Sequence, residues 1–282
     1  MRFYPAELHM AISLKNFDGV VKYVEAGGKL DRLWHGETPV SCAIYVKAYE
    51  ILDYLVKQGA SVNVVTQDDK MEPPLFAACR LGRREAVHIL LDGPNLDIDQ
   101  RDFFNRTPLW AAVRYSSVEV VGLLLEHGAD VTAAQDFIEC PLLLSILMLQ
   151  RNPFNKIPHL LIKRGCLVDI KNREGTPLYF SVKYENRELF YLLIRAGCSV
   201  PNEKWLTAAE LPLSWKRDEG FCQWICSLHN NPRSLLHLAS LVIRRELVEN
   251  HKNIFLHMLH SYPCQELYKD FCFWKIKDLD DV

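Results

Sequence analysis

The 282-residue sequence has no long uninterrupted run of apolar residues. Its longest run, residues 141–149, is about half the ~20 residues that a membrane-spanning helix requires. The first residues also lack the continuous apolar segment and the small-residue cleavage site of a secretory signal peptide. We therefore expect a cytoplasmic protein with no membrane contact, and the sequence leaves nuclear presence open.

An excess of charge of one sign is also absent. The 33 Lys and Arg residues nearly balance the 35 Asp and Glu residues, so the formal net charge is −2. Such a chain has no general electrostatic attraction to a phosphate backbone. The composition therefore predicts that nucleic acid is not a partner.

The motifs of common catalytic centres are missing as well. There is no G-x-S-x-G nucleophile motif, no phosphate-binding glycine loop and no H-E-x-x-H zinc motif. Cys222, Cys226 and His229 share one side of a predicted helix, but zinc usually takes four ligands and no second pair lies nearby in the sequence. Core packing is therefore favoured over metal binding for these three residues. The sequence predicts no catalytic residue, metal or cofactor, and hence a protein that is not an enzyme.

What the sequence does contain is a repeat of about 33 residues. Five prolines recur at intervals of 33 to 36 residues, at Pro39, Pro74, Pro108, Pro141 and Pro177. Six glycines recur at intervals of 32 to 37 residues, at Gly27, Gly59, Gly93, Gly128, Gly165 and Gly197. Two independent sets of residues with nearly the same period indicate a repeat architecture.

The copy around Pro108 shows what each repeat encodes. Thr107 is suited to cap a first helix that begins at Pro108, and Ser116 with Glu119 indicates a capping box for a second helix. Gly128 is suited to the left-handed end of that second helix. Two antiparallel helices and an extended finger cannot bury their apolar faces alone, so each repeat requires neighbours.

The repeat sequences resemble those of the ankyrin-repeat family. The openings ETPV, EPPL, RTPL, ECPL and GTPL match its T-P-L, and the closes GASVN, GADVT, GCLVD and GCSVP match its G-A-x-(V/I). The resemblance covers residues 5–203 and implies an all-α solenoid of about six repeats. The family's histidine after T-P-L is replaced throughout, which predicts a less regular stack. The replacing residues are Ser41, Phe76, Trp110, Leu143 and Tyr179.

Four of the nine cysteines stand where this repeat usually has alanine. They are Cys42, Cys79, Cys166 and Cys198. We expect them to be small buried residues in a reducing compartment, not disulfide partners.

After the repeats we predict three further segments. Residues 204–231 are expected to form a capping or linking helix, residues 232–274 a three-helix module, and residues 275–282 a tail. The module begins with a strongly apolar helix and resembles the SOCS box. Ser234, Leu235 and Ile243 match the first-helix pattern of that family, whereas Ala239 stands where the family usually has cysteine.

The resemblance to a SOCS box implies two docking sites. The residues expected to bind elongin C are Ser234, Leu235, Leu238, Ala239, Val242 and Ile243. The residues expected to bind a cullin are Tyr262, Pro263 and Leu267. The cullin motif of the family, L-P-Φ-P, is reduced here to His260-Ser261-Tyr262-Pro263, which retains only the last proline.

Repeats followed by this box are the layout of the ankyrin-repeat and SOCS-box family. That resemblance implies a substrate-recognition adaptor for a ubiquitin ligase containing elongin B, elongin C and cullin-5, with a protein substrate on the repeats. The alternative is an interaction scaffold whose degenerate box does not recruit a cullin.

Candidate substrate-binding residues follow from the repeat register. Finger tips lie just before each opening proline, and first-helix ends lie six or seven residues after it. Aromatic and arginine residues at such positions are typical of binding surfaces, although solvated tips that pack on their neighbours remain the alternative. The candidates are Trp34, Tyr45, Arg80, Phe103, Phe104, Arg114, Tyr115, Phe137, Lys183 and Tyr184. We expect Arg80, Arg114 and Lys183 to line one groove that binds an acidic segment with bulky apolar anchors, and we expect Arg80 and Arg114 to be exposed.

Overall fold

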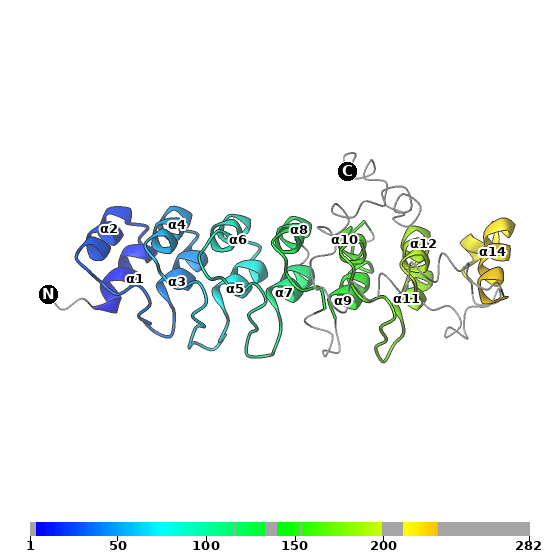
Figure 1. Cartoon of the computed structure of the whole chain (residues 1–282), viewed down its shortest axis with the longest axis horizontal. Helices are drawn as coiled ribbons and strands as arrows, with labels where there is room; N and C mark the ends of the chain where they lie inside the picture. The colour runs from blue at the N-terminus through cyan, green and yellow to red at the C-terminus, as the bar shows by residue number, and fades with distance from the viewer. Residues whose placement is uncertain (1–3, 116, 133–139, 153, 199–210, 231–282) are drawn as a thin grey trace, which may run out of the picture. The chain divides into compact units, whose positions relative to one another are not determined.

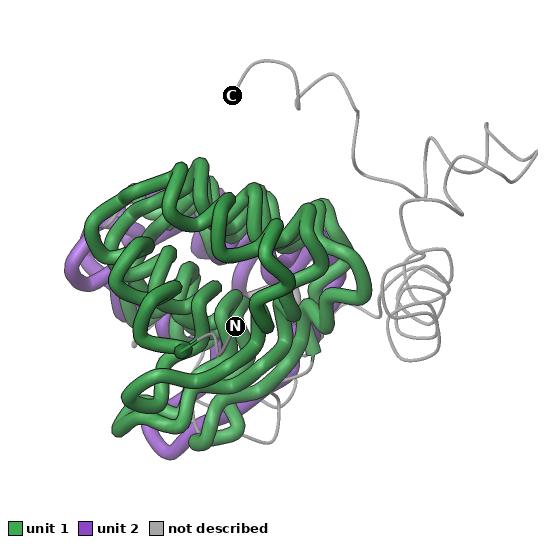
Figure 2. The backbone as a smooth tube through the Cα atoms, turned by 90° about the vertical axis from the view of Figure 1, so that its left-hand side faces the viewer, with its two compact units in different colours: residues 1–148, 154–157 green, residues 149–153, 158–282 purple. Residues whose placement is uncertain are grey.

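The computed structural model describes residues 4–115, 117–132, 140–152, 154–198 and 211–230 (Figure 1). The chain divides into two compact units, coloured separately in Figure 2. Unit 1 contains residues 1–148 and 154–157, and unit 2 contains residues 149–153 and 158–282.

Unit 1 is a stack of helix pairs. Its helices are α1 (Pro5–Ser13), α2 (Phe17–Glu25), α3 (Pro39–Val46), α4 (Tyr49–Lys57), α5 (Pro74–Arg80), α6 (Arg84–Leu91), α7 (Pro108–Arg114), α8 (Val118–Glu126) and α9 (Pro141–Met148). The odd-numbered helices pack successively on one another and form the first-helix row, while α2, α4, α6 and α8 form the second-helix row. The extended fingers that lead into α3, α5 and α7 all leave the stack on the same side (Figure 1).

Side chains join one finger of unit 1 to the next. Asp31 accepts a hydrogen bond from the Ser61 backbone N–H at 2.7 Å, and Asn63 accepts one from the Asp97 N–H at 3.0 Å. These bonds span 30 and 34 residues, which is one repeat each. They hold the bases of neighbouring fingers in register.

Unit 2 contains α10 (Ile157–Lys163) from its second residue onward, α11 (Pro177–Lys183), α12 (Arg187–Arg195), α13 (Leu213–Lys216) and α14 (Glu219–Asn230). α11 pairs with α12, and α13 pairs with α14. Pro212, which precedes α13, follows Pro177 by 35 residues. The helix pair therefore recurs once more after the predicted repeats, with its first helix shortened to a single turn.

The last helix pair packs against α12 through a cluster of aromatic rings. The Phe190 ring meets those of Trp215 and Phe221 edge to face, with centroids 5.4 and 6.1 Å away. Arg187 lies over the Trp215 and Phe221 rings. Its Nη2 is 3.0 Å from the Ser214 carbonyl oxygen on α13, and its Nη1 is 3.1 Å from Oδ2 of Asp218, which precedes α14. This packing covers one side of α12.

The first helices begin as the T-P motif predicts. The hydroxyls of Thr38, Thr107 and Thr176 accept the backbone N–H three residues later at 3.0 to 3.2 Å, and a proline follows each at the first helical position. Pro73 offers no side-chain cap before α5. Before α9, the Leu143 N–H donates to Cys140 Sγ at 3.4 Å, so a thiol stands in for the hydroxyl.

Two second helices depart from expectation, α6 at its end and α8 at its start. Gly128 adopts φ 87° after α8, as predicted, but Gly93 is not in the left-handed region, which Asn95 adopts instead at φ 56°. The cap of α8 is Ser117, whose hydroxyl accepts the Val120 N–H at 3.3 Å. The prediction of Ser116 was therefore wrong by one residue.

The core between the two helix rows consists of small and aliphatic side chains. In α7, Leu109, Ala111 and Ala112 have no exposed surface, and in α8 the same holds for Val120 and Leu124. The predicted burial of Cys42, Cys79, Cys166 and Cys198 is confirmed, and Cys140 is buried as well. Burial raises the pKa of the Cys79 thiol. Within the described ranges, every helix is too short or too polar to cross a membrane.

The cap before α9 makes a prediction about stability. Cys140→Thr restores a hydroxyl acceptor for the Leu143 N–H, so we expect it to stabilise unit 1 by about 0.5–1 kcal/mol. Thr107→Ala removes the same kind of bond before α7 and should destabilise by about 1 kcal/mol. Urea denaturation followed by circular dichroism measures both. A lower midpoint for Cys140→Thr would show that the thiol packs better than it caps.

Candidate protein-interaction surface

The finger tips of unit 1 expose large apolar side chains. Trp34, Met71, Phe103 and Phe104 are exposed by 41%, 43%, 68% and 58%, respectively. Each lies three to five residues before the proline of a first helix. Sequence analysis named three of these residues but missed Met71, whose only signal is its place three residues before Pro74.

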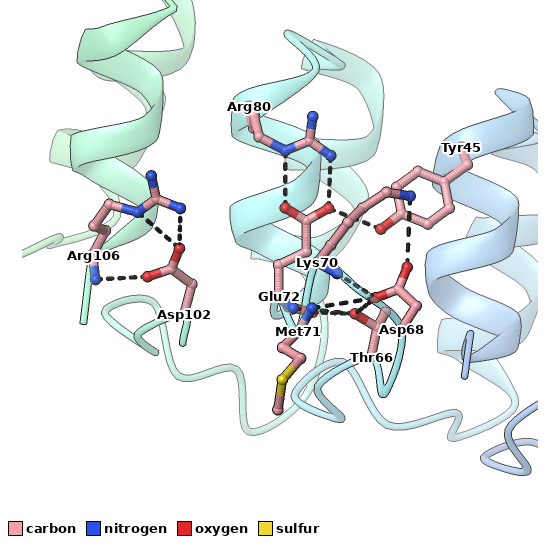
Figure 3. Close-up of polar contacts among 9 residues, drawn as sticks. All are labelled: Tyr45, Thr66, Asp68, Lys70, Met71, Glu72, Arg80, Asp102 and Arg106. Atoms are coloured by element: carbon pink, nitrogen blue, oxygen red, sulfur yellow. Dashed lines mark hydrogen bonds and ion pairs between the residues drawn. The ribbon is translucent and has the colours of Figure 1, made fainter. Parts of the chain in front are cut away.

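Behind the second of these finger tips lies a buried carboxylate, that of Glu72 (Figure 3). Only 3% of Glu72 is exposed. Arg80 donates to it from Nε and Nη2, at 2.9 and 2.7 Å, and Tyr45 donates from its hydroxyl at 2.8 Å. Tyr45 is on α3 and Arg80 on α5, so the ends of these two first helices lie on the same side of the stack. The two side chains meet at a residue of the protein itself.

This network neutralises Arg80. Burial, aided by the Glu72 carboxylate, raises the pKa of Tyr45, so its hydroxyl stays protonated and donates. The hydrogen bond to Glu72 raises the pKa of Arg80. The Arg80 side chain is 26% exposed, so the prediction that it is exposed was wrong. The reason is the Glu72 carboxylate, which draws the guanidinium back onto the finger.

Asp68 fixes the finger that carries Met71. Its carboxylate accepts hydrogen bonds from the Thr66 hydroxyl at 2.7 Å and from the Lys70 and Met71 N–H groups at 3.2 Å each. Burial alone would raise the pKa of Asp68, but these bonds and the Lys70 ammonium hold it below its usual value. Lys70 in turn lies 4.0 Å from the centre of the Tyr45 ring.

The next finger has an arginine, Arg106, at the position that Glu72 occupies in the finger before it. Arg106, like Glu72, stands two residues before its first-helix proline. Its Nε donates to Asp102 Oδ2 and its backbone N–H to Asp102 Oδ1, both at 2.8 Å (Figure 3). The guanidinium lies 4.7 Å from the ring centres of Phe104 and Trp110 and 5.3 Å from that of Phe76. Arg106 therefore joins an exposed finger tip to the buried helix behind it.

At the far end of α7, Arg114 and Tyr115 face outward to different extents. Tyr115 is 52% exposed, whereas Arg114 is half-buried, so the predicted exposure of Arg114 was also wrong. Arg114 Nη1 lies 3.7 Å from Met148 Sδ on α9, so the ends of α7 and α9 are also neighbours. Trp110 is 8% exposed, and its Nε1 has no acceptor within reach in the described residues.

In unit 2 the candidate residues lie around one aromatic ring. Lys183 is exposed, and its ammonium lies 5.6 Å from the centre of the Phe180 ring. Tyr184 stacks on that ring at 5.9 Å, and burial raises the pKa of Tyr184. Phe137 and all of the predicted elongin- and cullin-binding residues lie outside the described residues.

Among the residues that the structure describes, no group of three or more His, Cys, Asp or Glu side chains could hold a metal ion. The Cys222 thiol donates to the Trp215 carbonyl oxygen at 3.4 Å. The side chains of Cys226 and His229 lie outside the described residues.

Comparison with known families identifies the repeats. The model described as "Ankyrin repeat" matches residues 35–67, and the model described as "Ankyrin repeats (3 copies)" matches residues 64–135. The chain contains ankyrin repeats. A solved ankyrin-repeat domain from Acinetobacter baumannii AYE aligns with a TM-score of 0.62 at 24% identity, over 68% of this chain and 98% of that one. The predicted all-helical ankyrin solenoid is thereby confirmed.

Two curated proteins show how far the likeness extends. Human "Ankyrin repeat and SOCS box protein 16" is 26% identical over 288 residues, covering 86% of this chain and 62% of that protein. "Alpha-latrocrustotoxin-Lt1a" of Latrodectus tredecimguttatus is 38% identical over 99 residues, which are 35% of this chain and 7% of the toxin. The chain thus spans only a small part of the toxin. The ankyrin repeats of this chain form a scaffold for protein interaction.

The two arginines in the same register should respond differently to charge reversal. Arg80→Glu places a second carboxylate beside buried Glu72 and leaves it unpaired, so we expect a loss of at least about 3 kcal/mol of stability. Arg114→Glu breaks no ion pair among the described residues and should cost less than about 1 kcal/mol. Thermal and urea denaturation of the two variants provide the comparison. Equal losses would contradict the assigned role of Glu72.

Proposed function

We propose that this chain is a substrate-recognition adaptor of a ubiquitin ligase built on elongin B, elongin C and cullin-5. In this proposal the ankyrin repeats hold a target protein, and residues 232–274 dock on elongin C and the cullin. The chain catalyses nothing itself, because ubiquitin transfer belongs to the conjugating enzyme that the ligase recruits.

The extent of the likeness to the human ankyrin-repeat and SOCS-box protein carries the proposal. That alignment covers 86% of the chain. Residues 1–203, which include all of the predicted repeats, are less than 86% of the 282 residues. The match therefore continues beyond residue 203. The family-model matches at residues 35–135, in contrast, concern the repeats alone. Residues after 203 are where Ser234, Leu235 and Ile243 resemble the first helix of a SOCS box.

The surface of unit 1 supports the target-binding part of the proposal. Protein interfaces are enriched in aromatic residues, methionine and arginine, and the finger tips expose Trp34, Met71, Phe103 and Phe104. Hydrogen bonds to Asp68 and Asp102 fix two of these fingers before any partner binds. Less conformational entropy is then lost on binding than for a mobile loop.

The alternative is an interaction scaffold that recruits no cullin. The reduced motif around Pro263 favours this alternative, because the first two positions of L-P-Φ-P are His260 and Ser261 here. Both functions use the repeats in the same way and differ only in what residues 232–274 bind.

Elongin docking is tested by changing Leu235. Burying a leucine contributes about 1.5–3 kcal/mol, so Leu235→Asp should weaken elongin B/C binding at least about a hundredfold once the cost of burying a charge is added. Leu213→Asp is the matched control, because Leu213 is 77% exposed on α13 and its change should leave binding intact. Co-purification and calorimetric titration with elongin B/C measure both variants. Wild-type binding by Leu235→Asp would rule out the SOCS-box assignment.

Cullin recruitment is tested by restoring the motif. The double change His260→Leu and Ser261→Pro converts the sequence to L-P-Y-P, and we expect it to bind cullin-5 at least about tenfold more tightly than the natural chain, since two apolar contacts are regained. Cullin-5 is titrated onto the preformed complex with elongin B/C. Equal affinity of both chains would show that the reduced motif is sufficient.

A further inference from the structure

The third and fourth repeats have different residue types at the same three positions. The third repeat has Glu72, Phe76 and Arg80 at two residues before its first-helix proline and at two and six residues after it. Glu72 and Arg80 form two hydrogen bonds with each other, so this set is electrically neutral and its guanidinium is paired with a carboxylate. The phenylalanine between them has no polar atom to satisfy.

In the fourth repeat the same three positions hold Arg106, Trp110 and Arg114. The acceptor at the first position has become a donor, and the indole adds another donor at the second. Asp102 pairs with Arg106, but Arg114 contacts only the Met148 sulfur and the Trp110 N–H has no acceptor among the described residues. At these three positions, the fourth repeat therefore has more hydrogen-bond donors than acceptors.

Trp110, whose N–H has no acceptor among the described residues, and Arg114, whose described acceptor is a thioether sulfur, lie on one side of α7. Trp110 and Arg114 are four residues apart, and side chains at this spacing share a helix face. Arg106 stacks on the Trp110 ring at 4.7 Å and on the exposed Phe104 ring at the same distance. A continuous set of contacts thus runs from the aromatic finger tip, past the paired arginine, to the helix face that carries Arg114.

We propose that Arg114 binds a carboxylate of a partner protein, in an extended acidic segment whose flanking apolar side chains rest on Phe103, Phe104 and Tyr115. This inference rests on the proposed role of the ankyrin repeats in target binding and assigns that role to the fourth repeat. A half-buried guanidinium without a carboxylate suits an ionised acceptor, because a charge-assisted bidentate pair is stronger there than in open water. Arg80 takes no part in it, because its charge is already met by Glu72.

Selection from a random peptide library tests the proposal without a known partner. The full-length chain is immobilised, and a displayed library of random 12-residue peptides serves as the probe. The wild type should enrich peptides with Asp or Glu flanked by aromatic or large aliphatic residues. With Arg114→Gln, the acidic preference should disappear while the apolar preference remains, and Arg114→Lys should partly restore it.

Affinities of one selected peptide give the magnitude. Arg114→Gln should weaken its binding roughly tenfold to a hundredfold, as expected for the loss of a hydrogen bond to a charged group. Arg84→Gln is the control, because it removes one exposed positive charge from the second-helix row and should change the affinity less than about twofold. Circular dichroism melts establish that all variants are folded.

Three results would overturn the inference. The first is that the wild-type chain enriches no peptide, or only peptides without acidic residues. The second is that Arg114→Gln binds the selected peptide with unchanged affinity. The third is that the preference for acidic residues emerges only in the Glu139→Gln variant. Glu139 stands two residues before Pro141, as Glu72 does before Pro74, so the last result would assign the acceptor of Arg114 to the chain itself. None of these outcomes affects elongin binding, so the adaptor proposal stands or falls separately.

Discussion

The structure depends on one constraint, which is that a pair of short helices cannot bury its own apolar faces. The helices of unit 1 have seven to nine residues each, and such helices are marginal in water by themselves. Stacking gives α3, α5 and α7 a neighbouring first helix on each side, and residues such as Leu109, Val121 and Leu124 lose all contact with solvent. Stability is therefore shared between neighbours, and a change in one repeat is felt mainly by the next.

The same stacking decides which polar residues are available to a partner. When repeats align, residues about one repeat apart in sequence become neighbours in space, as Tyr45 and Glu72 are. A carboxylate on a finger then meets the end of the preceding first helix, and burial makes this meeting compulsory because an unpaired buried charge is strongly unfavourable. In the third repeat this leaves no net charge for a ligand. In the fourth repeat Arg106 replaces the acidic residue, and Arg114 has no carboxylate among the described residues.

The finger tips combine apolar exposure with polar support. Phe103 and Phe104 project from a finger whose base is fixed by Asp102, and Met71 follows the turn that Asp68 holds. A surface of this kind presents large apolar area in one conformation. The proposed adaptor function and the scaffold alternative both use this surface, and the sequence after residue 231 is where they differ.

The sequence by itself determined the repeat and its boundaries to a large extent. Threonine before proline specifies a helix start through bonds between adjacent residues, and glycine specifies a helix end through its own backbone freedom, so both signals are local. Repetition then made the all-helical stack predictable. One error was also local, because the cap of α8 falls on Ser117 and not on Ser116. The helix predicted within residues 204–231 is α14 (Glu219–Asn230), and the single-turn helix α13 (Leu213–Lys216) precedes it.

The state of the candidate site was decided by the tertiary structure alone. Arg80 and Arg114 occupy the same position in successive repeats, and the sequence difference that separates them lies eight residues earlier, where Glu72 of one repeat is replaced by Arg106 in the next. In the folded protein, the difference is whether a finger carboxylate lies within about 3 Å of the guanidinium. That distance depends on the packing of the finger against the first-helix row. Arg80 contacts Glu72, whereas Arg114 contacts Met148. Only packing decided that the charge of Arg80 is used to hold the protein together.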